Sequence, residues 1–187
     1  MRIFLVNPSD VAFGVGVITP RWLYVLAGAT PRQYGDPVIV DETLEPIDEE
    51  QIQPGDVVGI GIHTANALRG FQVGRMARER GAHVVFGGIH STLYPNEAHE
   101  YGSAHSVVKG DGDVIWSTVL SDIVNGEAKP LYHIDCLSSH SRWRRIASSP
   151  VDTDQRAVLW RICDFSRFQR DGNIRLTIQQ WGFLFHR

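Results

Sequence analysis

Short runs of apolar residues recur along the first two thirds of the chain, and turn-forming residues bound most of them. The first run ends at Val6 and leads into Asn7-Pro8-Ser9-Asp10, and a later run starts at Val57 after Pro54-Gly55-Asp56. Short apolar runs bounded by such turns are typical of buried β-strands. The pattern predicts five strands, at residues 2–6, 38–41, 57–62, 83–86 and 106–108.

Between these runs, apolar residues recur at helical spacing and predict helices at 20–30, 66–80, 95–100 and 113–124. Thr19-Pro20 offers an N-cap and a first-turn proline, and Gly81 lies where a C-cap glycine is expected. We expect Asp113 to be the N-cap of the last helix; the alternative for Asp111 and Asp113 is a contact with a ligand. The second helix is expected to carry a solvated face made of Arg69, Arg75, Arg78 and Arg80.

Strands that alternate with helices indicate an α/β domain whose parallel sheet is covered on both faces. The sequence therefore predicts a doubly wound, five-stranded parallel sheet of the flavodoxin-like or Rossmann-like type. In such sheets ligands bind beyond the carboxyl ends of the strands. Four segments are expected to build the site, namely 7–19, 63–66, 87–91 and 109–113.

The composition is that of an ordinary globular protein, because 43% of the 187 residues are hydrophobic and 21% are charged. A net charge of -3 gives no basic excess for nucleic acid or an anionic lipid surface. No apolar run reaches the roughly 18–20 residues of a membrane span, and the apolar start is too short for a signal peptide. We therefore expect a cytoplasmic protein without a membrane span that binds no nucleic acid.

Charge and aromatic content change between residues 130 and 140. Residues 1–140 carry a net charge of -8, whereas residues 141–187 carry +5 and include Trp143, Trp160 and Trp181. The second segment shows no sustained helical or strand period. We expect a folded domain at 1–132 and an atypical tail, rich in Arg and Trp, at 133–187 that is out-of-frame or disordered.

The loops after the strands discriminate among the ligands of such sheets. A dinucleotide site needs three spaced glycines directly after the first strand, but here Gly14 and Gly16 lack the third and lie far beyond the strand end. A receiver domain needs an aspartate where His63 lies. The segment 7–13 is largely apolar compared with a flavodoxin phosphate loop. A flat apolar ligand would suit these loops better.

Three longer segments carry a family resemblance. They read Gly-Ile-His-Thr-Ala-Asn-Ala-Leu-Arg-Gly at 61–70, Phe-Gly-Gly-Ile-His-Ser-Thr-Leu-Tyr-Pro-Asn-Glu-Ala at 86–98 and Val-Val-Lys-Gly-Asp-Gly-Asp at 107–113. The opening Phe-Gly-Val-Gly-Val-Ile-Thr-Pro-Arg-Trp-Leu-Tyr at 13–24 belongs with them. Together they resemble the N-terminal cobalamin-binding domain of B12-dependent radical SAM enzymes, and hopanoid C-3 methylase-like proteins in particular. The resemblance covers roughly residues 1–132.

The resemblance implies a cobalamin cofactor whose nucleotide tail runs against the backbone of Gly87 and Gly88. Thr64 and Asn66 would make small polar contacts, and the segment 110–112 would close the far side. A Gly88→Val substitution is then expected to abolish cobalamin retention and leave the fold largely intact. The expected cofactor contacts are Asn7, Pro8, Val17, Thr19, His63, Thr64, Asn66, Leu68, Gly87, Gly88, Ile89, His90, Gly110, Asp111 and Gly112.

Many cobalamin domains supply a lower axial histidine from the loop after the first strand, but this chain has no histidine before His63. Bound cobalamin is therefore expected to be base-off, without a histidine ligand. His63 and His90 are either satisfied turn histidines or ligand contacts.

Other glycines and histidines are expected to have structural roles or none. Gly59 and Gly61 should only permit close helix packing. No role is expected for three histidines in solvated segments, namely His83, His99 and His105.

The three-cysteine motif that holds the iron–sulfur cluster in the radical SAM family is absent. Cys136 and Cys163 cannot form it, so neither a cluster nor S-adenosylmethionine cleavage is expected of this chain. A radical SAM domain would act in cis or in trans. We hypothesise that a frameshift or gene-model error has replaced that domain; the alternative is a genuine, divergent tail.

Two functions stay open. The first is a cobalamin-binding module that is catalytic only within a methyltransferase-type radical enzyme, where cobalt would carry a methyl group from S-adenosylmethionine to an unactivated carbon. The second is a non-catalytic α/β interaction domain that has lost its ligand.

Overall fold

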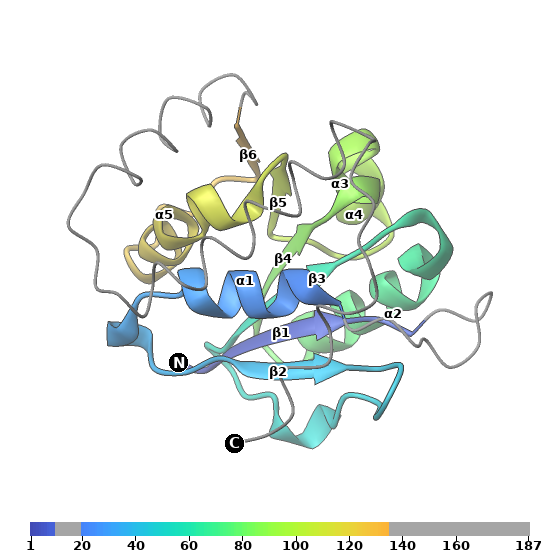
Figure 1. Cartoon of the computed structure of the whole chain (residues 1–187), viewed down its shortest axis with the longest axis horizontal. Coiled ribbons are helices and arrows are strands. Elements are labelled where there is room, and N and C mark those ends of the chain that lie inside the picture. The colour runs from blue at the N-terminus through green and yellow to red at the C-terminus, as the bar shows by residue number, and fades with distance from the viewer. Residues whose placement is uncertain (10–19, 135–187) are drawn as a thin grey trace, which may run out of the picture. The chain divides into compact units, whose positions relative to one another are not determined.

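One sheet of parallel strands organises residues 1–9 and 20–134, which are the residues that this computed structural model describes. The strand order is β2-β1-β3-β4-β5-β6 (Figure 1). The strands are β1 (Ile3–Asn7), β2 (Val38–Asp41), β3 (Val57–Gly61), β4 (His83–Gly87), β5 (Ser106–Lys109) and β6 (Leu131–His133). All neighbouring strands pair in parallel. The predicted parallel α/β fold is therefore confirmed.

The sheet has one strand more than the five that the sequence predicts. β6 pairs with β5 at the edge of the sheet and buries only Tyr132. Three residues with one buried side chain are too few to show the two-residue period of a strand. The Tyr132 hydroxyl donates to a carboxylate oxygen of Asp122 at 3.0 Å and accepts from the Lys129 N–H at 3.0 Å, which holds this edge in place.

Helices and short 3-10 turns connect the strands. The α-helices are α1 (Arg21–Ala29), α2 (Ala67–Glu79), α3 (Ile89–Leu93), α4 (Pro95–Glu100) and α5 (Gly112–Val124), and the 3-10 turns are η1 (Arg32–Tyr34), η2 (Glu49–Gln51) and η3 (Thr64–Asn66). The four predicted helices are present. α3 was not predicted, because its residues were assigned to a loop.

The winding direction reverses between β1 and β3. From β1 the chain passes to β2 on one side, whereas β3 and the later strands lie on the other. α1 and α5 pack together over one face of the sheet, and α2 packs on β3 and β4 from the other (Figure 1).

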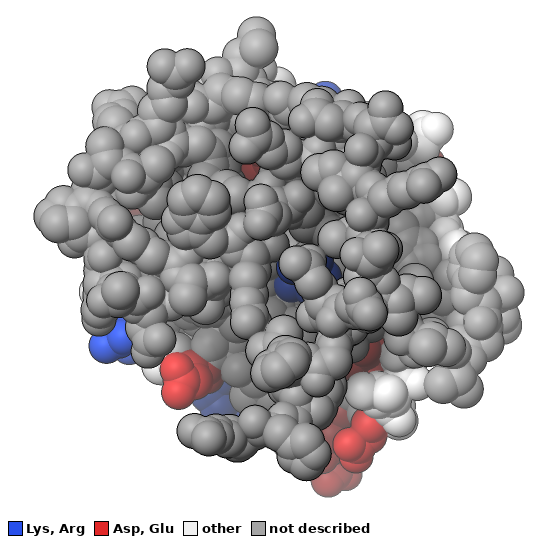
Figure 2. All heavy atoms as spheres, viewed as in Figure 1, with Lys and Arg blue, Asp and Glu red and all other residues white. Residues whose placement is uncertain are grey.

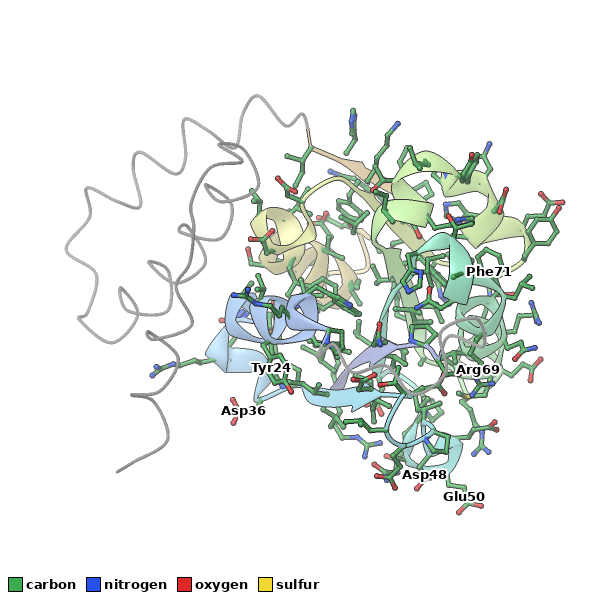
Figure 3. The ribbon with its side chains drawn as sticks, turned by 45° about the vertical axis from the view of Figure 1, so that its right-hand side comes forward. Tyr24, Asp36, Asp48, Glu50, Arg69 and Phe71 are labelled. Atoms are coloured by element: carbon green, nitrogen blue, oxygen red, sulfur yellow. The ribbon has the colours of Figure 1, made fainter. Side chains whose placement is uncertain are left out.

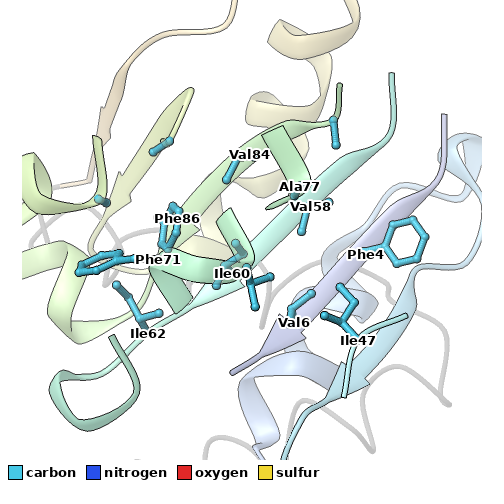
Figure 4. Packing of buried hydrophobic residues seen from close by; sticks show 14 of the residues in the cluster. Phe4, Val6, Ile47, Val58, Ile60, Ile62, Phe71, Ala77, Val84 and Phe86 are labelled. Atoms are coloured by element: carbon cyan, nitrogen blue, oxygen red, sulfur yellow. The ribbon is translucent and has the colours of Figure 1, made fainter. Parts of the chain in front are cut away.

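The face under α2 is filled by large side chains. Phe4, Ile60 and Phe86 from three strands and Phe71 of α2 belong to one buried cluster, and all four are at most 4% exposed (Figure 4). The rings of Phe71 and Phe86 lie 6.0 Å apart between centroids in a tilted arrangement. Burial of such aromatic side chains supplies much of the driving force for folding.

The face under α1 and α5 is built from the alternate strand positions. Leu5 and Val85 point to this side and pack with Leu23 of α1 and Trp116 of α5. Because side chains alternate along a strand, each of the buried strands contributes to both cores.

The N-cap prediction for α5 is wrong. Asp111 occupies the N-cap position and Asp113 lies inside the first turn, because the helix already begins at Gly112. Asp111 and Asp113 lie on either side of that glycine, and either carboxylate could cap a helix. The spacing of apolar residues in the helix did not show which of the two is the N-cap.

The predicted solvated arginine face on α2 is confirmed for Arg75, Arg78 and Arg80, which are exposed, whereas Arg69 is half-buried. The guanidinium groups of Arg75 and Arg78 donate to the backbone carbonyls of Tyr101 and Ser103, the latter at 3.0 Å. Arg69 pairs with Glu42. Arg69, Arg75 and Arg78 therefore hold α2 to neighbouring loops.

Acidic side chains gather along the lower edge of the described surface in Figure 2, where Figure 3 labels Asp48 and Glu50.

Within residues 1–9 and 20–134, no helix is long and apolar enough to cross a membrane.

His83 and His105 are not solvated as predicted, because their rings stack at the amino ends of β4 and β5. The centroids lie 4.5 Å apart, and His105 Nδ1 accepts the Val84 N–H at 3.0 Å. Burial lowers the pKa of His83 to about 4, and the charges of His105 and Arg78 act in the same direction. Burial and Arg78 also lower the pKa of His105. His99 is half-buried, and its Nδ1 lies 3.1 Å from the Ala104 carbonyl.

The folded protein should lose stability as pH falls from about 6.5 to about 4, because the unfolded state protonates His83 before the folded state does. The stabilisation is present above pH 6.5 and lost below the folded pKa. We expect His83 to account for roughly 2 kcal/mol of that loss, with allowance for solvent at the half-buried ring. Urea unfolding of wild type and His83→Gln at several pH values measures it. Equal pH slopes in both proteins would contradict the prediction, and His99→Gln serves as the control.

Candidate functional site

Glycines replace larger side chains at the carboxyl end of the sheet, on the face under α1 and α5. Gly59 and Gly61 lie on β3, and Gly87 lies beside Gly61 on β4. A Cβ at Gly61 would lie 2.5 Å from the Trp22 ring, and one at Gly59 would lie 3.3 Å from the Trp116 ring. The predicted role of Gly59 and Gly61 in close helix packing is confirmed, but the expectation that they have no other role is wrong, because both also line a cavity.

These glycines also form the floor of a cavity of about 450 Å³ between α1 and α5. A Cβ at Gly87 would meet no atom within 4 Å, which shows that space remains above this residue. The lining residues are Trp22, Val25, Leu26, Gly59, Ile60, Gly61, Ile62, His63, Val85, Phe86, Gly87, Gly88, Ile89, Val108, Gly110, Asp111, Gly112, Asp113 and Trp116. The cavity has the size and the largely apolar lining of a small-molecule site.

A hydrogen bond fixes one aromatic wall of the cavity. Trp116 Nε1 donates to Thr30 Oγ1 at 2.9 Å, and that hydroxyl donates to the Leu26 carbonyl at 3.0 Å. Trp116 is 2% exposed and Thr30 is 8% exposed. The indole of α5 is thereby tied to the end of α1, so the distance between the two helices is constrained.

The titratable side chains of the cavity are His63, Asp111 and Asp113. His63 and Asp111 are exposed, whereas Asp113 is half-buried. Burial raises the pKa of the Asp113 carboxyl, the charge of Asp111 raises it further, and the backbone N–H groups of Asp113 and Val114 oppose the shift. None of the described lining residues is Lys or Arg. The lining is therefore poorly suited to a group with several negative charges.

Gly88 is required by the backbone, which corrects the expectation that Gly88→Val leaves the fold intact. Its φ is +92°, a region that L-residues other than glycine rarely adopt, and a Cβ would lie 2.5 Å from the Ile62 carbonyl oxygen. Substitution of Gly88 would therefore disturb the β3–β4 junction. Gly87, which has open space above it, is the position where a side chain would enter the cavity.

Thr92 of α3 connects two of the loops around the cavity. Its hydroxyl donates to the Gly88 carbonyl at 2.9 Å and accepts the Gly110 N–H at 3.1 Å. The loop after β4 and the loop after β5 are thus held together by one side chain.

The cavity brings together seven of the residues that the sequence predicts as cofactor contacts: His63, Gly87, Gly88, Ile89, Gly110, Asp111 and Gly112. Six others do not line it: Asn7, Pro8, Thr64, Asn66, Leu68 and His90. Val17 and Thr19 lie outside the described residues, as do Cys136 and Cys163. Sequence reasoning missed Trp22 and Trp116, and it favoured a helix cap over a ligand contact for Asp113, which lines the cavity. The alternate glycines of β3 were the available signal, since they leave one face of a buried strand empty.

Asn66 lies at the carboxyl edge of the sheet, and its side chain is bonded within the protein. Its Oδ1 accepts the His63 N–H at 2.8 Å, and its Nδ2 donates to the Pro8 carbonyl at 3.1 Å. Asn66 is 1% exposed. Asn7 similarly donates to Asp41 at 3.0 Å. These residues tie the ends of neighbouring strands together.

The ring nitrogens of His90 both have partners within the protein. Nε2 lies 3.0 Å from a carboxylate oxygen of Glu97, and Nδ1 lies 3.4 Å from Thr64 Oγ1. The ring also packs against Phe71 and Tyr94. These partners favour the interpretation of His90 as a satisfied histidine, and its contact with a ligand stays a prediction.

The described residues contain no group of three or more His, Cys, Asp or Glu side chains that could hold a metal ion.

An ion pair between Arg69 of α2 and the buried Glu42 was not anticipated. Glu42, whose side chain is 1% exposed, accepts from Arg69 at 2.7 and 2.9 Å (Figure 3 labels Arg69). It also accepts the N–H groups of Ser9 and Ile47 at 3.2 and 3.3 Å. The pair raises the pKa of Arg69 and joins α2 to the segments after β1 and β2.

Comparisons with known proteins relate this chain to methyltransferases. It is 33% identical over 110 residues to the bacteriochlorophyllide d C-8(2)-methyltransferase of Chlorobaculum tepidum, which covers 59% of this chain and 24% of the relative. It is 28% identical over 117 residues to the C-12(1)-methyltransferase of the same organism, covering 63% of this chain and 25% of the relative. The chain is related in sequence to part of these methyltransferases. It spans about a quarter of their length.

The fold is shared with a solved methyltransferase. The radical S-adenosylmethionine methyltransferase TsrM from Kitasatospora setae matches with a TM-score of 0.54 and 24% identity, over 68% of this chain and 26% of TsrM. That structure contains a tryptophan substrate and an S-adenosylmethionine analog. No protein-family model matches the chain.

Removing Arg69 should destabilise the protein, because the buried Glu42 carboxylate would keep only backbone donors. We expect Arg69→Met to lower the free energy of unfolding by about 2–3 kcal/mol, since an unpaired buried charge is costly. The double variant Glu42→Leu/Arg69→Met should recover part of that loss. The exposed Arg80 provides the control Arg80→Met. Equal urea midpoints for Arg69→Met and Arg80→Met would refute the prediction.

Proposed function

We propose that residues 1–132 form a cobalamin-binding domain and that the cavity takes the nucleotide tail of the cofactor. The observation that carries the proposal is the cavity over Gly59, Gly61 and Gly87, at the carboxyl ends of β3, β4 and β5. This is the edge at which doubly wound sheets bind ligands. Exposed glycine backbone lets a ligand approach the strand ends closely.

The chemistry of the lining suits a planar, uncharged base. Aromatic and aliphatic side chains from α1 and α5 form the walls, and a volume of about 450 Å³ accommodates a bicyclic base with its sugar. The absence of Lys and Arg among the described lining residues disfavours the pyrophosphate of a dinucleotide. A cobalamin tail would place its neutral base in such a space and leave its phosphate outside.

Apolar surface at the same edge could support the rest of the cofactor. Leu68 after β3 is 78% exposed, and Ile89 and Leu93 in α3 after β4 are 64% and 62% exposed. Exposed apolar groups gathered next to a cavity are typical of binding surfaces. Leu68 therefore keeps its proposed contact with the cofactor although it does not line the cavity.

The domain would act as one part of a methyltransferase. The relatives are methyltransferases of which this chain matches about a quarter. Bound cobalamin would supply methyl-group transfer, in a reaction that needs a radical SAM domain in cis or in trans. The residues of this domain would hold the cofactor and shield it, and this chain would carry no iron–sulfur cluster.

Gly87→Val should abolish cobalamin retention and leave the fold intact. The new side chain would enter the cavity, whereas its Cβ meets no neighbour within 4 Å. The full chain is incubated with hydroxocobalamin and desalted, and the corrin absorbance that stays with the protein is measured. We expect about one corrin per wild-type chain and less than a tenth of that for the variant, with unfolding midpoints that agree closely.

Gly28→Val is the matched control. Gly28 also has open space, but it lies on the exposed side of α1 and does not line the cavity. This control should retain cobalamin. Retention by Gly87→Val would show that the tail lies elsewhere, and failure of the wild type to retain corrin would favour the interaction domain that has lost its ligand.

Bound cobalamin should be base-off and without a histidine ligand. His90 is engaged with Glu97 and Thr64, and residues 7–19 contain no histidine. In the cob(II)alamin state, electron paramagnetic resonance should show cobalt hyperfine lines without the threefold splitting that a coordinated nitrogen causes. A nitrogen triplet that disappears in His63→Ala would identify His63 as the axial ligand and overturn the assignment.

A further inference from the structure

Asp113 is placed to contact a ligand in the cavity. It lies in the first turn of α5, three residues before Trp116, and both residues line the cavity. Residues three apart share one side of a helix. Asp113 therefore lies on the side of α5 that faces the glycine floor.

The other side chains of the lining offer few polar groups at this depth. The indole N–H of Trp116 is used by Thr30. His63 and Asp111 are exposed, so water satisfies them, whereas Asp113 is half-buried. Asp113 is thus the half-buried carboxyl group among the described residues of the lining.

A base in this cavity would need a hydrogen-bond donor. In base-off cobalamin the ring nitrogen that could bind cobalt is instead a free acceptor, and an acceptor buried without a partner is costly. A neutral carboxyl group can donate one hydrogen bond. Burial and the neighbouring Asp111 both favour the neutral form of Asp113, because they raise its pKa.

We propose that Asp113 holds the tail of the ligand by donating a hydrogen bond from its carboxyl group to a ring nitrogen of the buried base. The inference rests on the proposed cobalamin function and adds the residue that recognises the tail. The ligand class it selects is a neutral planar base with a nitrogen acceptor.

Comparison of cobalamin with cobinamide tests the proposal, because cobinamide has the corrin ring but no nucleotide tail. Dissociation constants of hydroxocobalamin and diaquocobinamide are measured for the full chain by equilibrium dialysis. Asp113→Leu should weaken cobalamin binding about tenfold and leave cobinamide binding unchanged. Asp113→Asn, whose amide can still donate, should stay within about threefold of wild type.

The ratio of the two dissociation constants reports the contribution of the nucleotide tail to binding, separate from that of the corrin ring. Its pH dependence is a second measurement. In the wild type, the preference for cobalamin should fall as pH rises through the raised pKa of Asp113 and its carboxyl group ionises. The preference should be flat in Asp113→Asn. The titratable groups that share the cavity, Asp111 and His63, are unchanged in that variant, so any slope that remains belongs to them.

Asp36→Leu is the control, since Asp36 is an exposed carboxylate outside the cavity (Figure 3). It should bind both ligands as the wild type does. The proposal is overturned if Asp113→Leu weakens both ligands equally, or neither, or if the wild type binds cobinamide as tightly as cobalamin. In these cases the cobalamin function stands. A wild type that binds neither corrinoid defeats the proposed function itself. If Asp113→Leu does not fold, the pH profile of Asp113→Asn decides.

Discussion

The site depends on a register constraint. Parallel pairing places Gly61 of β3 directly beside Gly87 of β4, on the face of the sheet that α1 and α5 cover. With no side chains at this point, the sheet surface lies lower than elsewhere, and the helices above cannot fill the space. The Trp22 ring packs against Gly61 and the Trp116 ring packs near Gly59. No atom lies within 4 Å of the position that a Cβ at Gly87 would take. A shift of one residue would send these glycines to the opposite face.

The two faces of the sheet differ in packing, because one is densely filled and the other keeps a cavity. Under α2, Phe4, Ile60, Phe71 and Phe86 fill the interior, and Gly70 and Gly74 let the helix approach closely, since a Cβ at either would overlap with neighbours. Larger side chains at Gly70 or Gly74 would therefore not fit on that face. The opposite face keeps a cavity at one end and a packed core at the other. The chain can carry a poorly filled region because the dense face holds the strands in register.

Local sequence signals were enough for most of the fold. Apolar runs identified β1 to β5, and helical periodicity identified α1, α2, α4 and α5. β6 and α3 were not predicted, since each is too short to show a strand or helix period of apolar residues. The ion pair between Arg69 and Glu42 was not predicted either, because its two residues are 27 apart in the sequence and no local pattern relates them.

The candidate site was predictable only as far as topology decides it. The carboxyl ends of parallel strands meet at one edge, so the loops that contain His63, Gly87 and Gly110 were expected there. Topology does not decide which side chains enter the cavity. That depends on the rotation of each helix about its axis and on tertiary packing. Asn66 and His90 have suitable chemistry but bond to Pro8 and Glu97 and do not line the cavity. Asp113, which the sequence suggested as a helix cap, does line it.

The hydroxyl of Thr92 has a consequence for how a ligand would enter. Because it joins the Gly88 carbonyl to the Gly110 N–H, the two loops keep their relative position before any ligand arrives. The binding surface is therefore preorganised, and ordering of these loops does not oppose association. The entropic cost of binding would then fall chiefly on the incoming molecule. A binding site of this kind admits its ligand at a rate governed by encounter and orientation rather than by rearrangement of the protein.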